Sequence, residues 1–362
     1  MSMKASTKSS NNTRIIRIIA QTAVSIALIV LLMRIAMKGN LSATFGLIRP
    51  RILLLAAGLY LAACSLNARR WQLLLRYLGI NESLSRLNSL YFIGNFCSLF
   101  LPTSAGGDAY RIYEVARHRR SPLRVLLATL QERLTGLGVT VGVGLAVTLF
   151  YRDLFPDSLL WPVILVQSAG VLGVLILLYP GPFLNLARRA FLARVNPPVI
   201  QQLVRTSAVA RVATFLRPLR ESPPMTFSQV VPVLVLALVT FLLVALMYQV
   251  VGRSLGIDLS IPAFCLVVAL VWVVRMLPVS LNGIGVGEGA SVYLTGLFGV
   301  AADKGLALAL TVLGIQTAIA LLGGLLLVFR TLRASWGPGG AQSSQQPSSS
   351  SDRGEAEIRP AA

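Results

Sequence analysis

Long apolar stretches alternate with short, arginine-rich polar stretches along most of the chain. A run of about 18 or more apolar residues is long enough to cross a bilayer as a helix. Two further apolar segments are shorter and are interrupted by proline and glycine. The pattern predicts an all-α polytopic integral membrane protein with about six to eight transmembrane helices. The predicted spans are 18–37, 52–68, 122–150, 159–180, 227–251 and 305–330, and the interrupted segments are 87–103 and 259–280.

A short sequence pattern occurs once in each half of the chain. Residues 76–81 (Arg-Tyr-Leu-Gly-Ile-Asn) are matched by residues 253–258 (Arg-Ser-Leu-Gly-Ile-Asp). Each copy is followed by an apolar run that ends in Leu-Pro-x-Ser-x-x-Gly, at 101–107 and at 277–283. Paired segments that proline and glycine interrupt at matching places are typical of transporters built from repeats. Chance similarity between two leucine-rich runs is the alternative.

Arginine between the apolar segments accounts for most of the net charge of +20. Such a charge can indicate nucleic-acid binding, but the interleaved spans favour attraction to the inner membrane face. The positive-inside rule places the basic loop 181–226 in the cytoplasm, together with both chain termini. It places the linkers 151–158 and 252–258 outside, because acidic residues offset their arginines. Residues 34–51 are also basic and would lie outside, against the rule.

Both flanks of segment 87–103 are basic, so a full crossing would place one basic cluster outside. A re-entrant hairpin keeps both flanks in the cytoplasm, with a turn built from Asn95, Pro102 and the glycines. Three full spans lie between segment 87–103 and segment 259–280, so a second hairpin must enter from the opposite face. The half-repeats, about 52–150 and 227–330, would then form an inverted repeat. Broken backbone in lipid needs protein or a water-filled cavity to satisfy it, so the breaks predict a cavity.

The remaining regions carry little chemistry. Residues 1–13 and 336–362 are polar and predict disordered cytoplasmic tails on a membrane domain at 14–335. The three cysteines have no metal-ligand or disulfide spacing, so we interpret them as core packing. We expect no cofactor, no metal and no nucleic-acid partner.

Ionisable side chains within membrane segments are costly and are candidates for function. One interpretation is that they line one polar cavity, neutralise each other and contact a charged substrate. The alternatives are structural ion pairs that fasten the hairpins, or, for Arg111 and Glu288, a position in water at an interface. The candidates are Asp108, Arg111, Glu132, Arg133, Arg275 and Glu288.

Two further motifs have competing interpretations. The pattern Gly283-x-Gly285-x-Gly287 could present backbone N–H groups to a lipid phosphate, or could serve close helix packing. Residues 67–71, Asn-Ala-Arg-Arg-Trp, end a predicted span, where Trp and Arg are usually interfacial anchors. Contact of this segment with anionic headgroups is the alternative.

A set of ordered motifs resembles the lysylphosphatidylglycerol synthase transmembrane-region family, also called flippase-like membrane proteins. The similarity covers about 15–335. Members often carry Arg immediately before the last motif's Glu, whereas this chain has Gly287, so either Arg275 supplies that charge or the substrate contact differs. The motifs are Arg70-Trp71, Gly94-Asn95 with Leu101-Pro102, Gly106-Gly107-Asp108 with Arg111, Glu132-Arg133, and Pro278-x-Ser280-x-Asn282-Gly283-x-Gly285 with Glu288.

The resemblance implies a function in lipid translocation. In bifunctional members a similar membrane domain is thought to translocate aminoacylated phosphatidylglycerol, while a cytosolic domain attaches the amino acid. No such domain lies in this sequence, so synthase activity is not implied. We expect a multi-pass protein of the inner cell membrane that moves a phospholipid or lipid-linked sugar between leaflets. The expected substrate-binding residues are Arg70, Asn95, Ser104, Gly106, Gly107, Asp108, Arg111, Glu132, Arg133, Arg275, Ser280, Asn282, Gly283, Gly285 and Glu288.

Two other functions are compatible with the sequence. The first is a lipid-headgroup-modifying enzyme or subunit, for which Asp108 and Glu132 would be the acid–base pair. The second is a non-catalytic membrane scaffold for lipid-biosynthesis enzymes. Chemical turnover of the headgroup would distinguish an enzyme from a transporter, and leaflet redistribution would distinguish a transporter from a scaffold.

Overall fold

The computed structural model describes residues 41–100, 105–119, 121–178, 227–276, 280 and 283–335, and residues 30 and 34 singly. These residues form ten α-helices and one 3-10 turn, and the described part contains no strand. The helices are α2 (Leu41–Gly46), α3 (Pro50–Tyr77), α4 (Leu84–Phe100), α5 (Ala105–Arg119), α6 (Pro122–Phe150), α7 (Asp157–Leu178), α11 (Phe227–Ser254), α12 (Ile261–Arg275), α13 (Val286–Gly296) and α14 (Ala302–Ser335), with the turn η1 at Arg152–Leu154.

Five of these helices, α3, α6, α7, α11 and α14, are long and apolar enough to cross a membrane. They confirm the predicted all-α polytopic membrane protein, and α6 has the predicted bounds. Several predictions lie outside the described residues: the span 18–37, the loop 181–226 and the tails 1–13 and 336–362.

Helix α3 differs from its predicted span, because it continues past residue 68 to Tyr77. Proline is favoured at the first position of a helix, and Pro50 begins α3 there. The helix ends at Tyr77 and is followed by Leu78 and Gly79, whose φ of +79° suits glycine. The extension places Trp71 inside the bundle with no exposed surface. Its interpretation as an interfacial anchor is therefore wrong.

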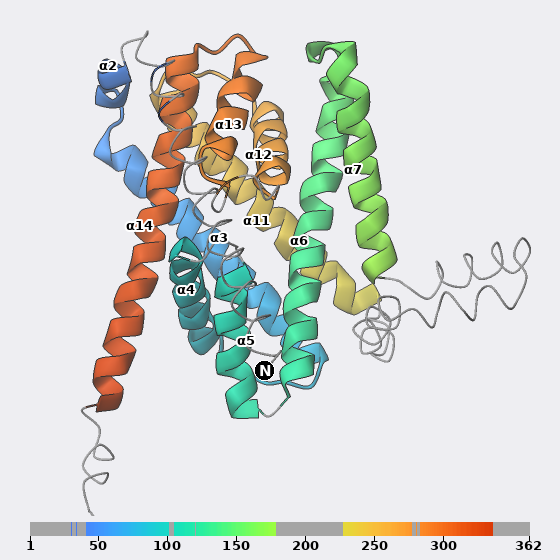
Figure 1. Cartoon of the computed structure of the whole chain (residues 1–362), viewed down its shortest axis with the longest axis vertical. Helices are drawn as coiled ribbons and strands as arrows, with labels where there is room; N and C mark the ends of the chain where they lie inside the picture. Colours follow the sequence, from blue (N-terminus) through green and yellow to red (C-terminus); the bar gives the residue numbers. More distant parts are fainter. Residues whose placement is uncertain are drawn as a thin grey trace, which may run out of the picture.

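The two interrupted segments form helical hairpins at opposite ends of the bundle (Figure 1). The α4–α5 hairpin lies where α3 ends and α6 begins, and the α12–α13 hairpin lies where α11 ends and α14 begins. Each hairpin packs arm against arm, and both reach towards the middle of the molecule. This is the predicted inverted arrangement. One detail was wrong: Asn95 lies within helix α4 and not in the turn.

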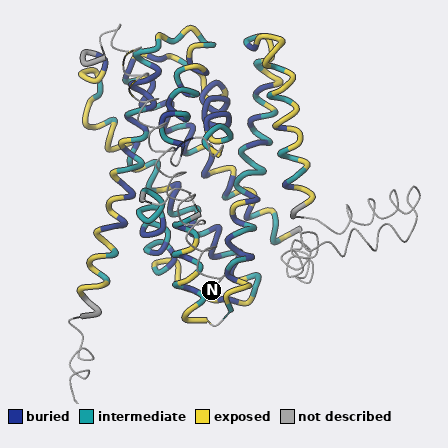
Figure 2. The backbone as a smooth tube through the Cα atoms, in the orientation of Figure 1, coloured by how far each residue is buried: buried dark blue, intermediate teal, exposed yellow. Residues whose placement is uncertain are grey.

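The two halves meet mainly through α3, which packs along α11 (Figure 1). One apolar cluster surrounds α11 and α12, and a second surrounds Trp71 between α3, α4, α5 and α6. Figure 2 shows these buried residues in the centre of the bundle, whereas α7 is largely exposed along its length. Gly138 and Gly170 let α7 approach α6, because their missing side chains leave room for Val174 and Val141.

Candidate functional site

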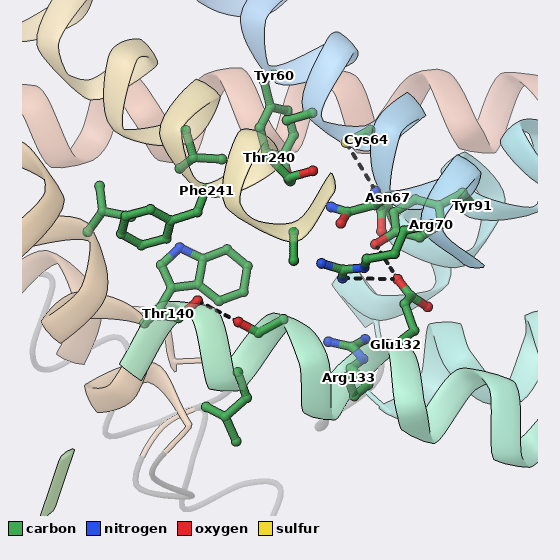
Figure 3. A pocket seen from close by; sticks show the side chains of 18 of the residues that line it. Tyr60, Cys64, Asn67, Arg70, Tyr91, Glu132, Arg133, Thr140, Thr240 and Phe241 are labelled. Carbon is green, nitrogen blue, oxygen red and sulfur yellow. Dashed lines mark hydrogen bonds and ion pairs between the residues drawn. The ribbon is translucent and has the colours of Figure 1, made fainter. Parts of the chain in front are cut away.

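A cavity of about 180 Å³ lies between the two halves of the repeat (Figure 3). Helices α3, α4 and α6 form one wall, and α11 and α12 form the other. Its position fulfils the expectation that broken helices border a cavity. The lining residues are Tyr60, Ala63, Cys64, Asn67, Arg70, Tyr91, Asn95, Glu132, Arg133, Gly136, Leu137, Thr140, Ala237, Thr240, Phe241, Val244, Val268, Trp272, Val273 and Met276.

The cavity has a charged part and an apolar part (Figure 3). Arg70, Glu132 and Arg133 gather on the side of the first hairpin. Phe241 and Trp272 belong to the opposite wall, with aliphatic side chains around them. One space therefore offers both ionic and apolar surface. A ligand with a charged head and a hydrocarbon tail can satisfy both at once.

Glu132 is the central carboxylate of the charged part and is only 2% exposed. Its Oε2 accepts a hydrogen bond from Arg111 Nη1 at 3.2 Å. Its Oε1 lies 3.6 Å from Arg70 Nη2 and accepts a hydrogen bond from the Tyr91 hydroxyl at 3.3 Å. A buried carboxylate is costly unless it is paired, and these partners neutralise it.

Arg111 holds the buried side of the same cluster. Its guanidinium pairs with Asp108 as well as with Glu132. It lies over two aromatic rings, 4.9 Å from the Trp71 centroid and 4.4 Å from the Tyr91 centroid. Both contacts are cation–π interactions, which strengthen when water is excluded. Arg111 is 3% exposed and is absent from the described cavity lining, so its geometry matches that of a structural ion pair.

Arg133 belongs to the same charge cluster and lines the cavity. Its Nε donates to Asp108 Oδ2 at 2.7 Å, while 47% of its side chain remains exposed. Asp108 therefore joins Arg111 on its buried side to Arg133 on its open side. Counting Arg70, the cluster holds three arginines against two carboxylates. One formal positive charge is left over, and it favours an anionic ligand.

Several polar atoms around this cluster have no hydrogen-bond partner among the described residues. Arg70 Nε is one and Asn67 Oδ1 is another, and both residues line the cavity. Asn95 donates a long hydrogen bond, 3.7 Å, to Cys64 Sγ. Buried polar groups are almost always paired, so these orphaned atoms indicate a place where a ligand or water completes the bonding.

The second hairpin has its own, smaller ion pair. Arg275 Nη2 lies 2.7 Å from Glu288 Oε1, and Nη1 donates to Gln316 Oε1 at 3.4 Å. Glu288 is 1% exposed and also accepts a hydrogen bond from the Gly285 backbone N–H, which caps α13. Neither Arg275 nor Glu288 is among the described lining residues of the cavity. The predicted ionisable residues thus form two clusters.

The glycines of the second hairpin serve close packing. Gly283 and Gly285 have φ values of +74° and +88°, which other residues rarely adopt. A side chain at Gly287 would overlap Arg275 Nε, so the missing side chain gives Arg275 its path to Glu288. Arg275 therefore supplies the positive charge beside Glu288. The Gly285 N–H, which could have bound a phosphate, is used by this carboxylate.

The first hairpin also depends on glycine. A side chain at Gly107 would overlap the Gly94 carbonyl oxygen and the Ser98 hydroxyl, so these glycines let α4 and α5 touch. Gly106 lies beside them in the first turn of α5. These glycines are packing residues in the structure, and their expected contact with substrate stays a prediction.

The structure separates the sequence-predicted site residues. Arg70, Asn95, Glu132 and Arg133 line the cavity, whereas Asp108 and Arg111 support them from behind. The residues of the second hairpin lie apart, with the Ser280 hydroxyl buried and unpaired among the described residues. Ser104 and Asn282 lie outside the described residues.

Sequence reasoning missed the uncharged part of the site. Tyr91 and Thr240 touch the cavity, but each sits in a helix that reads as ordinary apolar membrane sequence. A polar residue within an apolar membrane helix is the sequence signal that could have identified them. Whether each one faces the interior of the bundle could not be assigned before the packing of α4 and α11 was known.

A sequence model for the family described as Lysylphosphatidylglycerol synthase TM region matches residues 18–324. No curated protein and no solved structure matches the chain. The match covers most of the chain and all of the cavity. This membrane protein therefore belongs to the lysylphosphatidylglycerol synthase transmembrane-region family.

Proposed function

We propose that this family member moves a lipid with a phosphate-containing headgroup between the leaflets of the inner cell membrane. The observation that carries the proposal is the cavity between the inverted hairpins, which is charged on one side and apolar on the other. A lipid headgroup crossing a bilayer needs polar partners at the depth where water is absent. The cavity offers these partners within a bundle of membrane helices.

The arginines suit a phosphate. Arg guanidinium groups match phosphate oxygens in geometry, and charge-assisted hydrogen bonds are stronger than neutral ones. Arg70 has an unpaired Nε, and Arg133 has an exposed face towards the cavity. The apolar wall with Phe241 and Trp272 can then receive the glycerol ester region and the start of the acyl chains.

The orientation follows from the charges at the two ends of the bundle. The end with the first hairpin carries Arg76, Arg86, Arg117, Arg119 and Arg124. At the other end acidic residues offset the arginines of the linkers 151–158 and 252–258, whereas Arg49 and Arg51 at the start of α3 run against the rule. The positive-inside rule then places the first hairpin at the cytoplasmic face, and the charged side of the cavity nearer to it.

The contacts of the carboxylates argue against a headgroup-modifying enzyme. Such an enzyme needs a carboxylate free to accept a proton from substrate. Asp108 is held by Arg111 and Arg133, and Glu132 by Arg70, Arg111 and Tyr91. These bonds suit a charged framework that binds an anion and leaves its covalent bonds intact.

The test is leaflet redistribution in vesicles that contain the purified full-length chain. Phosphatidylglycerol with a fluorescent acyl chain is placed in both leaflets, and a membrane-impermeant quencher bleaches the outer one. With the wild-type protein nearly all fluorescence should be quenched, because labelled lipid from the inner leaflet reaches the outer one. Thr240→Trp, which fills the cavity, should slow quenching at least tenfold, whereas Leu165→Trp on the exposed face of α7 should not. A wild-type protein no faster than protein-free vesicles would reject the proposal.

A further inference from the structure

The neutral polar side chains of the cavity indicate which hydrogen-bonding groups a headgroup must have besides its phosphate. Thr140 and Thr240 stand on opposite walls, on α6 and α11 (Figure 3). Thr140 Oγ1 donates its proton to the Gly136 carbonyl at 2.9 Å, and Thr240 Oγ1 donates to the Leu236 carbonyl at 2.8 Å. A hydroxyl has one proton to give and two lone pairs to accept with. Both hydroxyls therefore meet the cavity as hydrogen-bond acceptors.

Asn67 adds a third acceptor to the same space. Its Oδ1 is buried and has no partner among the described residues. Asn67 Oδ1 needs a donor, because a buried acceptor without one costs free energy. The two hydroxyls already share their protons with backbone carbonyls, and each can still accept a hydrogen bond, so the cavity suits a ligand that brings donors. A phosphate cannot supply them, since its ionised oxygens only accept. The donors must come from another part of the ligand.

Two kinds of headgroup donor are available in lipids, hydroxyl groups and ammonium groups. The charge of the site distinguishes them. Arg70, Arg133 and Arg111 outnumber Asp108 and Glu132, and both carboxylates are already paired. An ammonium group entering this cluster would meet net positive charge and no free carboxylate among the described lining residues. A hydroxyl donates to the three neutral acceptors without that repulsion.

From these observations we infer that the ligand is an anionic lipid whose headgroup carries hydroxyl groups, such as a glycerol or a sugar attached to phosphate. The inference rests on the proposed function and narrows its substrate. Arg70 and Arg133 hold the phosphate, and Asn67, Thr140 and Thr240 accept from the hydroxyls. Headgroups that carry an amine or an aminoacyl group bind more weakly in this site.

Binding in detergent tests the inference without any translocation step. A fluorescent phosphatidylglycerol bound to the full-length chain is displaced by competitors with identical acyl chains. Phosphatidylglycerol and phosphatidylinositol should displace it about tenfold better than phosphatidylmethanol, which has the same charge and no hydroxyl. Phosphatidylethanolamine and lysylphosphatidylglycerol should be weaker than phosphatidylglycerol. Equal displacement by phosphatidylglycerol and phosphatidylmethanol, or preference for an amine, would overturn the inference.

Two variants test whether Thr140 and Thr240 cause the preference for phosphatidylglycerol over phosphatidylmethanol. Thr140→Val with Thr240→Val keeps the volume and removes both acceptors, so the tenfold preference should fall to about twofold or less while phosphatidylmethanol binds as before. Thr311→Val is the control, because Thr311 makes the same hydrogen bond to a carbonyl of its own helix and is not among the lining residues. A preference that survives the double substitution contradicts the assignment.

The outcomes also separate this inference from the proposed function. Selective binding without leaflet redistribution would reject the transporter and keep the headgroup assignment. Redistribution of phosphatidylglycerol and phosphatidylmethanol at equal rates, with equal binding, would keep the transporter and reject the headgroup assignment.

Discussion

The two hairpins share a backbone plan and differ in how their charges are used. Each has two half-length arms that break near glycine, and each carries an arginine paired with a buried carboxylate. At the first hairpin these pairs connect α6 to both α3 and α5. In the second, Arg275 and Glu288 join the two arms of the same hairpin, and their further described polar contacts are with Gln316 of α14 and the Gly285 backbone N–H.

This difference separates two tasks that an intramembrane charge can have. The pair in the second hairpin closes a break in the backbone and lies away from the cavity lining. The cluster at the first hairpin fastens three helices and also turns Arg70 and Arg133 towards the cavity. An inverted repeat can therefore keep its fold in both halves while the charged lining of the cavity comes from one of them.

The largest expected effect is the loss of Arg111. Arg111→Gln removes a partner from both Asp108 and Glu132, and Glu132 is only 2% exposed. Breaking such a buried pair costs about 3–5 kcal/mol. Arg275→Gln should cost less, about 1–3 kcal/mol, because Arg111 serves two carboxylates and two aromatic rings, whereas Arg275 pairs with Glu288 and 18% of its side chain is exposed. Thermal unfolding of both variants in one detergent measures the difference.

A second substitution checks the reason for that cost. Glu132→Gln added to Arg111→Gln removes the stranded charge and should recover at least half of the lost stability. Arg152→Gln is the matched control, since Arg152 is 70% exposed and pairs only with the exposed Asp153 in the described part. Equal losses for Arg111→Gln and Arg275→Gln would mean that the two hairpins use their charges alike.

The glycines give a smaller effect that sharpens the same comparison. Gly107→Ala pushes a methyl group against the Gly94 backbone, which cannot move aside, and should destabilise by about 1–3 kcal/mol. Gly287→Ala meets the Arg275 side chain, which can shift, so its cost should be lower. Gly314→Ala has open space around it and should be neutral or slightly stabilising. Unfolding temperatures that rank Gly287→Ala as the worst would contradict the packing described for the first hairpin.

Among the charged residues that line the cavity or support it, Arg133 should give the smallest change in stability. Its side chain is 47% exposed, and Asp108 keeps Arg111 as a partner, so Arg133→Gln should cost about 0.2–1 kcal/mol. Binding of anionic lipid should nevertheless fall several-fold, because a charge-assisted contact to phosphate is lost. A large loss of stability with unchanged lipid binding would assign Arg133 to the framework.

Much of the fold could be predicted from the sequence because its signals are local. Apolar length marks the spans, and the repeated Leu-Pro-x-Ser-x-x-Gly marks the two breaks. The end of α3 could not be placed, because Arg70 and Trp71 resemble an interface and only tertiary partners show that they are buried. Asn95 was misplaced for the same reason, since its helix is stabilised by packing against α5 and α14.

The site was predictable in its charges and not in its geometry. Ionisable residues in apolar segments stand out in the sequence, so Glu132 and Arg133 could be named. Their division into a cavity-facing set and a fastening set depends on side-chain directions, which place Arg111 between two aromatic rings and Arg133 at the opening. That Thr140 and Thr240 face one cavity depends on how α6 packs against α11, which the sequence does not show.

The most direct test of the central claim is the leaflet-redistribution rate of phosphatidylglycerol for Arg70→Gln. The rate is expressed per folded protein and compared with those of the wild type and Arg152→Gln. Because Glu132 keeps Arg111 and Tyr91 as partners, the Arg70→Gln variant should fold. Because Arg70 lines the cavity, the variant should redistribute lipid at least tenfold more slowly, with Arg152→Gln at the wild-type rate. A folded Arg70→Gln variant that works at the wild-type rate would contradict the claim that this cavity carries the headgroup.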